Sequence, residues 1–527
     1  MAAVAVAGGL VQSSSSAGAT LTVAYDASSS SYTLTDSGRS ATFAPVDLAG
    51  SAPPGVANYS QSNGNKLTLL TASPSSNAPR TYVGLGAWSD SQASGGTETT
   101  NYDTFTYGNP TPASAAPRTG QASYDIDLVG YLTTPGIETR SLTGPGVFNA
   151  DFLSGVFEAD VHPVENYLVT GSVNSGSGIE LLASGHLSSS DATFTGQVSF
   201  NDNSSAEYFG PISGRLYGPA GQEVGASFSG SNPNGGSLVG SFFGAQNGNA
   251  LGQNLALTDV FTPEPFNVLG SRLATAVPPT GSAIQFTVDQ LTLQPDGSIV
   301  YSPSLTPPLQ GSTFTTANIV APAHPNFISY QETVGGFPLQ LDLYNMGPGN
   351  TELALTYMDL GIWHEAATPP TVTGNEMSSF VFGIATPQWV VSGRTGSAQY
   401  AGVAYGGGAN LNLAVLYNVT GTSNFDVNFT AQTLSGSLTL NGAAVGGGAG
   451  VNFGTFTFAG AIPGNTNVYA TEYSNTLPVS LNGAVVGQLQ TQFYGPNAEE
   501  VGGPFYMVYD TSSATINVTG VAAAKRH

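Results

Sequence analysis

The side chains of this sequence that could take part in chemistry are mostly carboxylates, because cysteine is absent and histidine is scarce. The absence of cysteine rules out disulfides, thiolate metal sites and cysteine nucleophiles. The histidines lack the spacing of paired metal ligands; they are His162, His186, His324, His364 and His527. The chain also has no Gly-x-Ser-x-Gly, phosphate-loop or His-Glu-x-x-His motif. The sequence therefore does not predict an enzyme.

Two groups of oxygen-bearing side chains have the composition of a calcium site. Asp125 and Asp127 form the first group, and Asp202 with Glu207 forms the second, in a segment that also holds asparagines. Neither group has the EF-hand or the glycine-rich nonapeptide pattern, so solvated loops and strand ends are the alternative. We expect no required cofactor and keep calcium as a candidate ligand.

Two glutamates occupy matching positions in a motif that occurs twice. Leu216–Phe228 aligns with Phe493–Phe505 without a gap, at an offset of 277 (493 − 216). The motif residues are Tyr217, Gly218, Pro219 and Glu223 in the first copy, and Tyr494, Gly495, Pro496 and Glu500 in the second. An acid–base pair would need a cleft and a second partner. We therefore expect each glutamate to accept backbone N–H groups in the turn or to pair with an arginine.

Other blocks recur in the same order. Thr81–Trp88 aligns with Thr356–Trp363, and Arg118-Thr-Gly120 aligns with Arg394-Thr-Gly396. The chain is thus a tandem duplication of a unit of roughly 260 residues, a period far too long for a solenoid. Each copy should be its own domain or pair of domains.

The composition predicts which elements carry these residues. Charged residues make up 8% of the chain and hydrophobic residues 40%, with 68 glycines. Such a charge-poor, glycine-rich sequence with many apolar residues is typical of short strands joined by tight turns. Phe194, Val198 and Phe200 alternate with polar residues, which is the period of a half-buried strand. We predict an all-β fold whose sheets close into antiparallel barrels, because closure removes aggregation-prone edges.

The repeated motif resembles a sequence near the end of the barrel domain in transferrin-binding protein B and its solute-binding relatives. The pattern Phe-Tyr-Gly-Pro-x-Ala-x-Glu-x-Gly-Gly-x-Phe is complete in the second copy, whereas Gly221 and Ala226 depart from it in the first. Thr81–Trp88 and Thr356–Trp363 are similar to the first barrel strands of that family. The resemblance implies two lobes, each a β-rich handle followed by an antiparallel barrel of about eight strands.

The repeats and the turn signals then divide the chain into segments. A proline-rich stretch at Thr262-Pro-Glu-Pro265 marks the predicted linker between the copies. The predicted segments are an extended N-terminal arm (1–20), a first handle-like domain (21–80), a first barrel (81–245), a linker (246–282), a second handle-like domain (283–350), a second barrel (351–515) and a C-terminal tail (516–527).

The resemblance also implies noncatalytic binding, at the surface of a Gram-negative bacterium or outside it, of a protein or of an iron- or haem-type ligand. Loops at the ends of barrels and handles would carry the binding residues. The exposed-aromatic candidates are Trp363, Trp389, Tyr400 and Tyr405, and His364 is a candidate haem or metal ligand. Core packing is the alternative for the aromatics, and an ordinary loop position is the alternative for the histidine. Without cysteine, the lipid anchor of surface members of the family is not expected.

The net charge of −23, with no basic patch, argues against a nucleic-acid partner. Met1–Leu10 is too short to span a membrane and the uncharged tract Gly442–Gly464 is broken by glycine and proline, so we do not expect a transmembrane protein. The remaining candidate partners are another protein and further copies of this chain. The second hypothesis is therefore a self-assembling subunit of a surface layer, filament or sheath, whose N-terminal arm adds a strand to a neighbour.

Overall fold

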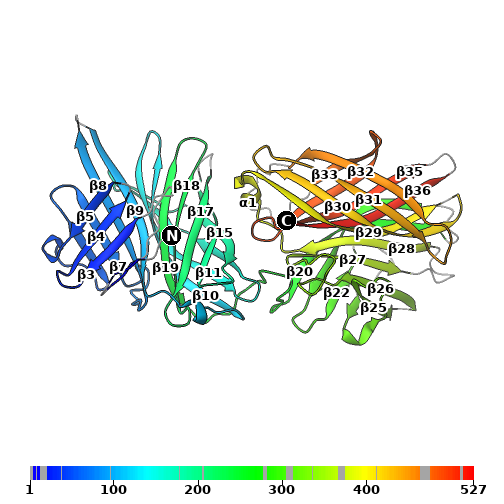
Figure 1. The fold of residues 1–527 in the computed structure, drawn as a ribbon, viewed down its shortest axis with the longest axis horizontal. Coiled ribbons are helices and arrows are strands. Elements are labelled where there is room, and N and C mark those ends of the chain that lie inside the picture. Colours follow the sequence, from blue (N-terminus) through cyan, green and yellow to red (C-terminus); the bar gives the residue numbers. More distant parts are fainter. Residues whose placement is uncertain are drawn as a thin grey trace. The chain divides into compact units, whose positions relative to one another are not determined.

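The computed structural model describes residues 4–6, 9–11, 21–36, 38–94, 97–176, 178–203, 207–276, 282–303, 312–334, 336–365, 374–410, 412–462, 475–510 and 514–527. These residues form two compact units, Met1–Leu251 and Gly252–His527. Each unit contains a handle of β-sheet and an antiparallel barrel (Figure 1). The predicted all-β fold with two handle-and-barrel lobes is confirmed.

The first barrel is closed because β10 pairs with both β11 and β19. Its eight strands are β10 (Gln121–Thr134), β11 (Ile137–Asp151), β12 (Val156–Val161), β15 (Ile179–Leu187), β16 (Thr193–Asp202), β17 (Tyr208–Tyr217), β18 (Glu223–Ser231) and β19 (Ser237–Gln246). A short hairpin of β13 (Val164–Tyr167) and β14 (Val173–Asn174) lies between β12 and β15 in the chain and pairs with β11.

The second barrel is a closed ring of eight strands in chain order. They are β29 (Ser397–Asn410), β30 (Val415–Asn428), β31 (Thr433–Ala444), β32 (Val451–Ala461), β33 (Asn475–Leu481), β34 (Ala484–Tyr494), β35 (Glu500–Asp510) and β36 (Thr515–Arg526). A short helix, α1 (Gln388–Gly393), precedes the ring. The repeated motif joins the sixth strand of each barrel to the seventh.

Alternating apolar side chains fill the barrels. Phe194, Val198 and Phe200 of β16 are buried in the first barrel, as the period-two pattern predicts. Gly196 stands in the same row, where an added Cβ would collide with backbone atoms of β15. The glycine therefore permits the close strand approach that a small, filled barrel needs.

Each handle packs beside the barrel of its own unit. The first handle has a three-stranded sheet of β3 (Thr22–Asp26), β4 (Ser31–Asp36) and β5 (Arg39–Phe43), and a four-stranded sheet of β6 (Val56–Ser60), β7 (Asn65–Leu70), β8 (Val83–Ser94) and β9 (Thr97–Gly108). The second handle is one nine-stranded sheet: β23 (Ser312–Phe314), β22 (Ile299–Ser302), β21 (Ser282–Leu293), β20 (Glu264–Ala276), β28 (Gly374–Gly383), β27 (Met358–Glu365), β26 (Phe337–Tyr344), β25 (Phe327–Val334) and β24 (Ile319–Val320).

Several predicted segment boundaries differ from the structure. The strands β8, β9, β27 and β28, predicted as barrel strands, belong to the handle sheets instead. Residues 264–276 of the predicted linker form β20, which pairs with β21 and β28 inside the second handle. The predicted tail 516–527 lies largely in β36, the strand that closes the second barrel. Handle and barrel strands share the same period of two, so alternation alone cannot assign a strand to a sheet.

The N-terminal arm is described only in part. Val4–Val6 and Gly9–Val11 pair with each other as an antiparallel hairpin, and the rest of residues 1–20 lies outside the described residues. In the part of the chain that the structure describes, no helix has the length and apolar character needed to cross a membrane.

Candidate functional site

The motif glutamates connect the barrel of each unit to its handle. The carboxylate of Glu223 accepts the backbone N–H groups of Thr81, Tyr82 and Val83 at 2.8, 2.7 and 2.7 Å. These amides belong to the start of β8, not to the turn that carries the glutamate. The prediction is thus right about backbone N–H donors but wrong in placing them in the turn, and no arginine of the described residues forms an ion pair with Glu223.

The second unit repeats this arrangement. Glu500 accepts the N–H groups of Thr356, Tyr357 and Met358 at 2.7, 2.9 and 2.9 Å. Burial raises the pKa of Glu500, while these donors and Lys525, whose Nζ lies 3.5 Å from Oε1, oppose the rise. Both carboxylates are buried and accept three backbone N–H groups each, so we assign them a structural role.

The glycines of the repeated motif lie where the barrel meets the handle, next to the motif glutamates. Gly218 and Gly495 both have φ of +87°, a conformation that favours glycine. A Cβ on Gly218 would lie 2.7 Å from the Tyr82 ring, and one on Gly495 would lie 2.5 Å from the Tyr357 ring. We call this region of each unit, around Glu223 or Glu500, the handle–barrel junction. It explains why the motif recurs in both copies.

The four aromatic residues predicted as exposed ligand contacts are buried, so this prediction is wrong. Trp363 stacks on Tyr301 inside the second handle, and Trp389 is buried on α1. The hydroxyl of Tyr400 donates to the Ala498 carbonyl at 2.6 Å, and that of Tyr405 donates to Glu352 at 2.7 Å. Packing against the handle or the barrel interior covers these rings.

His364 is half-exposed and pairs with one carboxylate. Its Nε2 lies 3.4 Å from Oδ2 of Asp342 on the neighbouring strand β26. Burial alone would raise the pKa of Asp342, but hydrogen bonds, from His364 first and also from Ser329 and Gln340, hold it below its usual value. The adjacent Glu365 is buried, as expected for the opposite face of a strand. A two-residue pair is not a metal-binding set.

Among the described residues, neither predicted calcium group is part of a cluster of three or more metal-ligating side chains. Asp127 lies 3.7 Å from the Arg80 guanidinium, and Asp125 accepts a hydrogen bond from the Asn247 amide at 2.7 Å. Asp202 is buried 3.1 Å from Arg140, whereas the carboxylate that acts on its predicted partner Glu207 is Glu180. These aspartates are thus held by protein donors rather than left as a ring of free oxygens.

The end of the first barrel away from the repeated motif has a feature that the second barrel lacks. This apical end carries the β10–β11, β12–β15, β16–β17 and β18–β19 connections. The connection between β12 and β15, residues 162–178, contains the β13–β14 hairpin, which we call the apical hairpin. The corresponding connection in the second barrel, residues 445–450, has no strands. The apical hairpin therefore distinguishes the two lobes.

A buried ion-pair network supports the apical hairpin. Arg140 of β11 lies 3.1 Å from Glu165 of β13 and 3.1 Å from Asp202 of β16. Asn174 of β14 donates a further hydrogen bond to Glu165 at 3.1 Å. Burial raises the pKa of Glu165, and the Arg140 guanidinium opposes that rise. The network ties both strands of the hairpin to the barrel.

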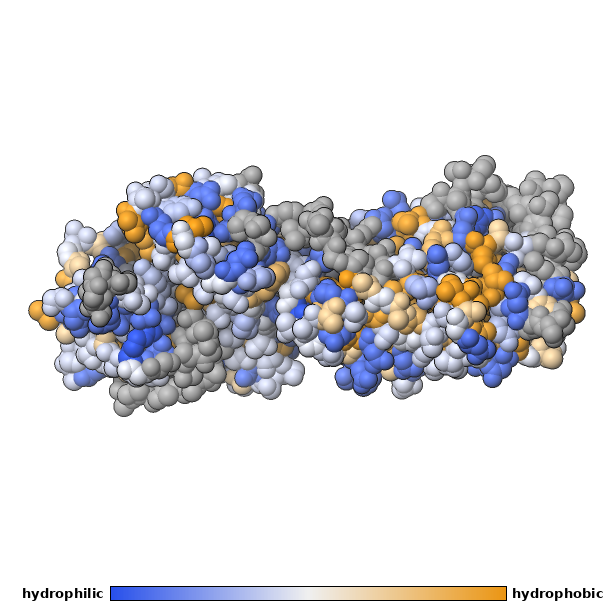
Figure 2. All heavy atoms as spheres, turned by 90° about the horizontal axis from the view of Figure 1, so that it is seen from above, coloured by the Kyte–Doolittle hydropathy of each residue, from blue (hydrophilic) through white to orange (hydrophobic). Residues whose placement is uncertain are grey.

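Aliphatic side chains of the apical hairpin and its neighbour face solvent. Ile137 in the β10–β11 region is 49% exposed, and Leu168, Val169 and Val173 are 43%, 83% and 62% exposed. The Leu168 N–H donates to the Thr139 carbonyl at 3.0 Å, which keeps the two segments adjacent. On the visible face, hydrophobic residues lie scattered among hydrophilic ones on the first unit, and a larger orange group lies on the second unit (Figure 2). The exposed aliphatic group of the apical hairpin and its neighbour is our candidate binding site.

Sequence reasoning missed this site, although a signal was present. The offset between the copies falls from 281 (436 − 155) to 277 (493 − 216) between two aligned blocks. The first copy is therefore longer over this interval, which contains the apical hairpin. An insertion in one copy of a duplicated unit is a natural place to look for a function that the copies do not share.

Comparisons with known proteins agree with the observed fold. Residues 393–526 match the family of C-lobe and N-lobe β-barrels of Tf-binding protein B. The predicted resemblance is thus confirmed, and the matched range coincides with the second barrel. No curated protein matches the chain in sequence.

Solved structures of transferrin-binding protein B are also similar to this chain. A double mutant of the Haemophilus parasuis Hp5 vaccine antigen is 16% identical with a TM-score of 0.30, over 96% of this chain and 94% of that protein. The isotype 1 protein of serogroup B Neisseria meningitidis is 15% identical with a TM-score of 0.24, over 85% of each chain.

Proposed function

We propose that this chain is a noncatalytic binding protein of the bacterial surface or extracellular medium, and that it binds a protein partner through the apical end of its first barrel. The observation that carries the proposal is the apical hairpin, with exposed aliphatic side chains on a buried ion-pair network. Exposed apolar side chains on a well-supported surface are typical of protein-binding sites.

The family match supports a binding role of this kind, because the matched barrels are named for a Tf-binding protein. For this chain the name supplies the first probe, transferrin. His364, the residue at which the sequence predicts haem, pairs with Asp342, and the neighbouring Trp363 is buried, so neither favours haem there. A protein ligand therefore fits the described surface better than a flat aromatic cofactor.

The hypothesis of a self-assembling subunit of a surface layer, filament or sheath makes a different prediction about assembly. Light scattering of the purified chain, with calcium and then with chelator, should show a monodisperse monomer if the chain is a partner-binding protein. Filaments or sheets would refute a purely partner-binding role. The described part of the arm pairs with itself as a hairpin, so that pairing does not by itself favour strand addition to a neighbour.

The binding experiment uses the immobilised full chain, first with purified transferrin and then with whole serum. Val169→Asp places a charge on the most exposed aliphatic residue of the apical hairpin. We expect retention of a specific serum protein by the wild type, and an affinity for it at least about tenfold weaker in the variant, since hot-spot residues contribute at this level.

The matched control is Val485→Asp, because Val485 is 68% exposed on β34 of the second barrel. This variant should bind as the wild type does. The proposal is wrong if the wild type retains no protein, or if Val169→Asp and Val485→Asp bind equally well.

A further inference from the structure

Three ligand-type side chains share one outer face of the first barrel. Asp160 and His162 stand two residues apart at the end of β12, so both point away from the buried Val161 between them. Glu180 on β15 likewise lies between the buried Ile179 and Leu181. Alternation on two neighbouring strands thus places all three on the same side.

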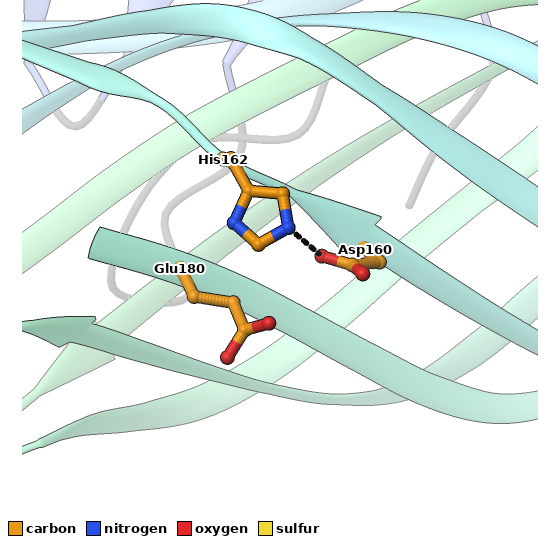
Figure 3. A group of neighbouring side chains, drawn as sticks. All are labelled: Asp160, His162 and Glu180. Carbon is orange, nitrogen blue, oxygen red and sulfur yellow. Dashed lines mark ion pairs between the residues drawn. The ribbon is translucent and has the colours of Figure 1, made fainter. Parts of the chain in front are cut away.

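The register brings the three side chains together. Val161 pairs with Leu181, so the next position along the ladder sets His162 opposite Glu180. The Nε2 atom of His162 lies 3.5 Å from Oδ1 of Asp160, and Figure 3 shows the Glu180 carboxylate beside the imidazole from the neighbouring strand. One ligand atom from each residue lies within 4.8 Å of the others. Donors around one ion with bonds of about 2.0–2.2 Å lie closer together than this limit, so the three side chains would converge on an ion by small rotations.

The negative charge at this place is not balanced by a fixed cation. Within the described residues, no arginine or lysine forms an ion pair with Asp160 or Glu180, and His162 is the nearest basic group. Burial and the Asp160 carboxylate raise the pKa of Glu180, although His162 opposes the rise. Burial and then Glu180 raise the pKa of Glu207. Carboxylates crowded in this way are stabilised by a divalent cation.

The neighbouring strand extends the row of polar atoms. Glu180 pairs with Asn201 of β16, and Phe200 pairs with Tyr208, so the same register continued by one residue sets Asn201 opposite Glu207. Glu207, for which the sequence predicts a cation, thus joins a different set of residues from its predicted partner Asp202. The polar side chains of this row therefore come from four consecutive barrel strands or the ends of those strands. They do not come from a single acidic loop.

We propose that Asp160, His162 and Glu180 bind a divalent transition-metal ion of the zinc class on the outer face of the first barrel. An imidazole with two carboxylates suits zinc better than calcium, which takes oxygen ligands alone. Three protein ligands leave a coordination position for water or for an atom of a partner. His162 begins the connection that forms the apical hairpin, so the metal would fasten the start of the hairpin to β15.

The test is isothermal titration calorimetry of zinc ion alone into the full untagged chain. We expect wild-type binding at one site in the first unit, weakened at least about tenfold by His162→Asn and by Glu180→Gln, since even outer-shell changes have effects of this size. Hydrogen exchange should show that zinc slows exchange in residues 162–178 of the wild type and not of either variant.

The matched control is His364→Asn, which removes a histidine from a pair of similar geometry that has no third metal-ligating side chain among the described residues. Its zinc affinity should equal that of the wild type. The proposal is overturned if the wild type binds no zinc, if either site variant binds as tightly as the wild type, or if His364→Asn abolishes binding. Since protein binding is tested separately with Val169→Asp, failure of one proposal leaves the other intact.

Discussion

Replacing Glu223 with glutamine tests the handle–barrel junction without changing the size of the side chain. In the native protein, Oε2 accepts the N–H groups of Tyr82 and Val83, and Oε1 accepts that of Thr81. A glutamine oxygen can replace Oε2, but its NH2 group then faces the Thr81 N–H, donor against donor. The variant therefore loses one hydrogen bond and weakens two others.

The magnitude follows from these contacts. A hydrogen bond to a charged group contributes about 1.5–3 kcal/mol and a neutral one about 1 kcal/mol, so the loss should total about 3–5 kcal/mol. For a unit of this size, each kcal/mol lowers the melting temperature by about 2–4 °C. We expect the first unit of Glu223→Gln to melt roughly 10 °C below that of the wild type.

Scanning calorimetry of the full chain, combined with hydrogen exchange, measures this effect. Amides 81–83 should exchange faster in Glu223→Gln, while amides 356–358 should be unchanged. Glu500→Gln should reverse this pattern, which makes each unit the control for the other. Stability within about 0.5 kcal/mol of the wild type, as for ordinary surface substitutions, would refute the structural role assigned to Glu223.

Three further substitutions test other parts of the structure. Gly495→Ala should destabilise the second unit by about 2 kcal/mol or more, because alanine is strained at a φ of +87° and its Cβ meets the Tyr357 ring; a normal second calorimetric transition would contradict this. Arg140→Met should cost about 3–5 kcal/mol at neutral pH by leaving Glu165 and Asp202 buried without their cation. Because burial raises the pKa of Glu165, its protonation should recover part of the loss as the pH falls, and protease resistance of residues 162–178 reports it. Burial raises the pKa of Asp359 far above its usual value, so the native second unit loses stability as the pH rises from the ordinary aspartate range. Asp359→Asn should therefore be the more stable protein at about pH 8, with an advantage that shrinks as the pH falls; pH-independent melting of both proteins would refute this.

The duplication and the all-β class could be predicted from the sequence because both are local patterns. Leu216–Phe228 and Phe493–Phe505 align directly, and alternating residues such as Phe194, Val198 and Phe200 report their own burial. The sequence also predicts Glu223 as an acceptor, either of backbone N–H groups or of an arginine, because a carboxylate in a tight turn needs such partners. Its actual donors were not predictable, because Thr81–Val83 lie about 140 residues earlier in the chain.

The candidate sites were less predictable for the same reason. Tyr405 looks like a free aromatic in the sequence, but the second handle supplies Phe327 and Tyr344 to cover it. His162 looks isolated until the register places Glu180 opposite it. Which strands are neighbours depends on the whole sheet order, and the spacing of residues along one strand carries no information about it.

The long separation between Glu223 and its amide donors also constrains the order of folding. When β8 leaves the ribosome, the carboxylate that accepts the N–H groups of Thr81, Tyr82 and Val83 has not yet been made. β10 likewise must wait for β19 to close the ring. Each lobe can consequently be completed only when its final strand has been synthesised. Until then, the chain lacks the long-range contacts that join the handle to the barrel and close the ring. We therefore expect the first lobe to be completed before the second during synthesis.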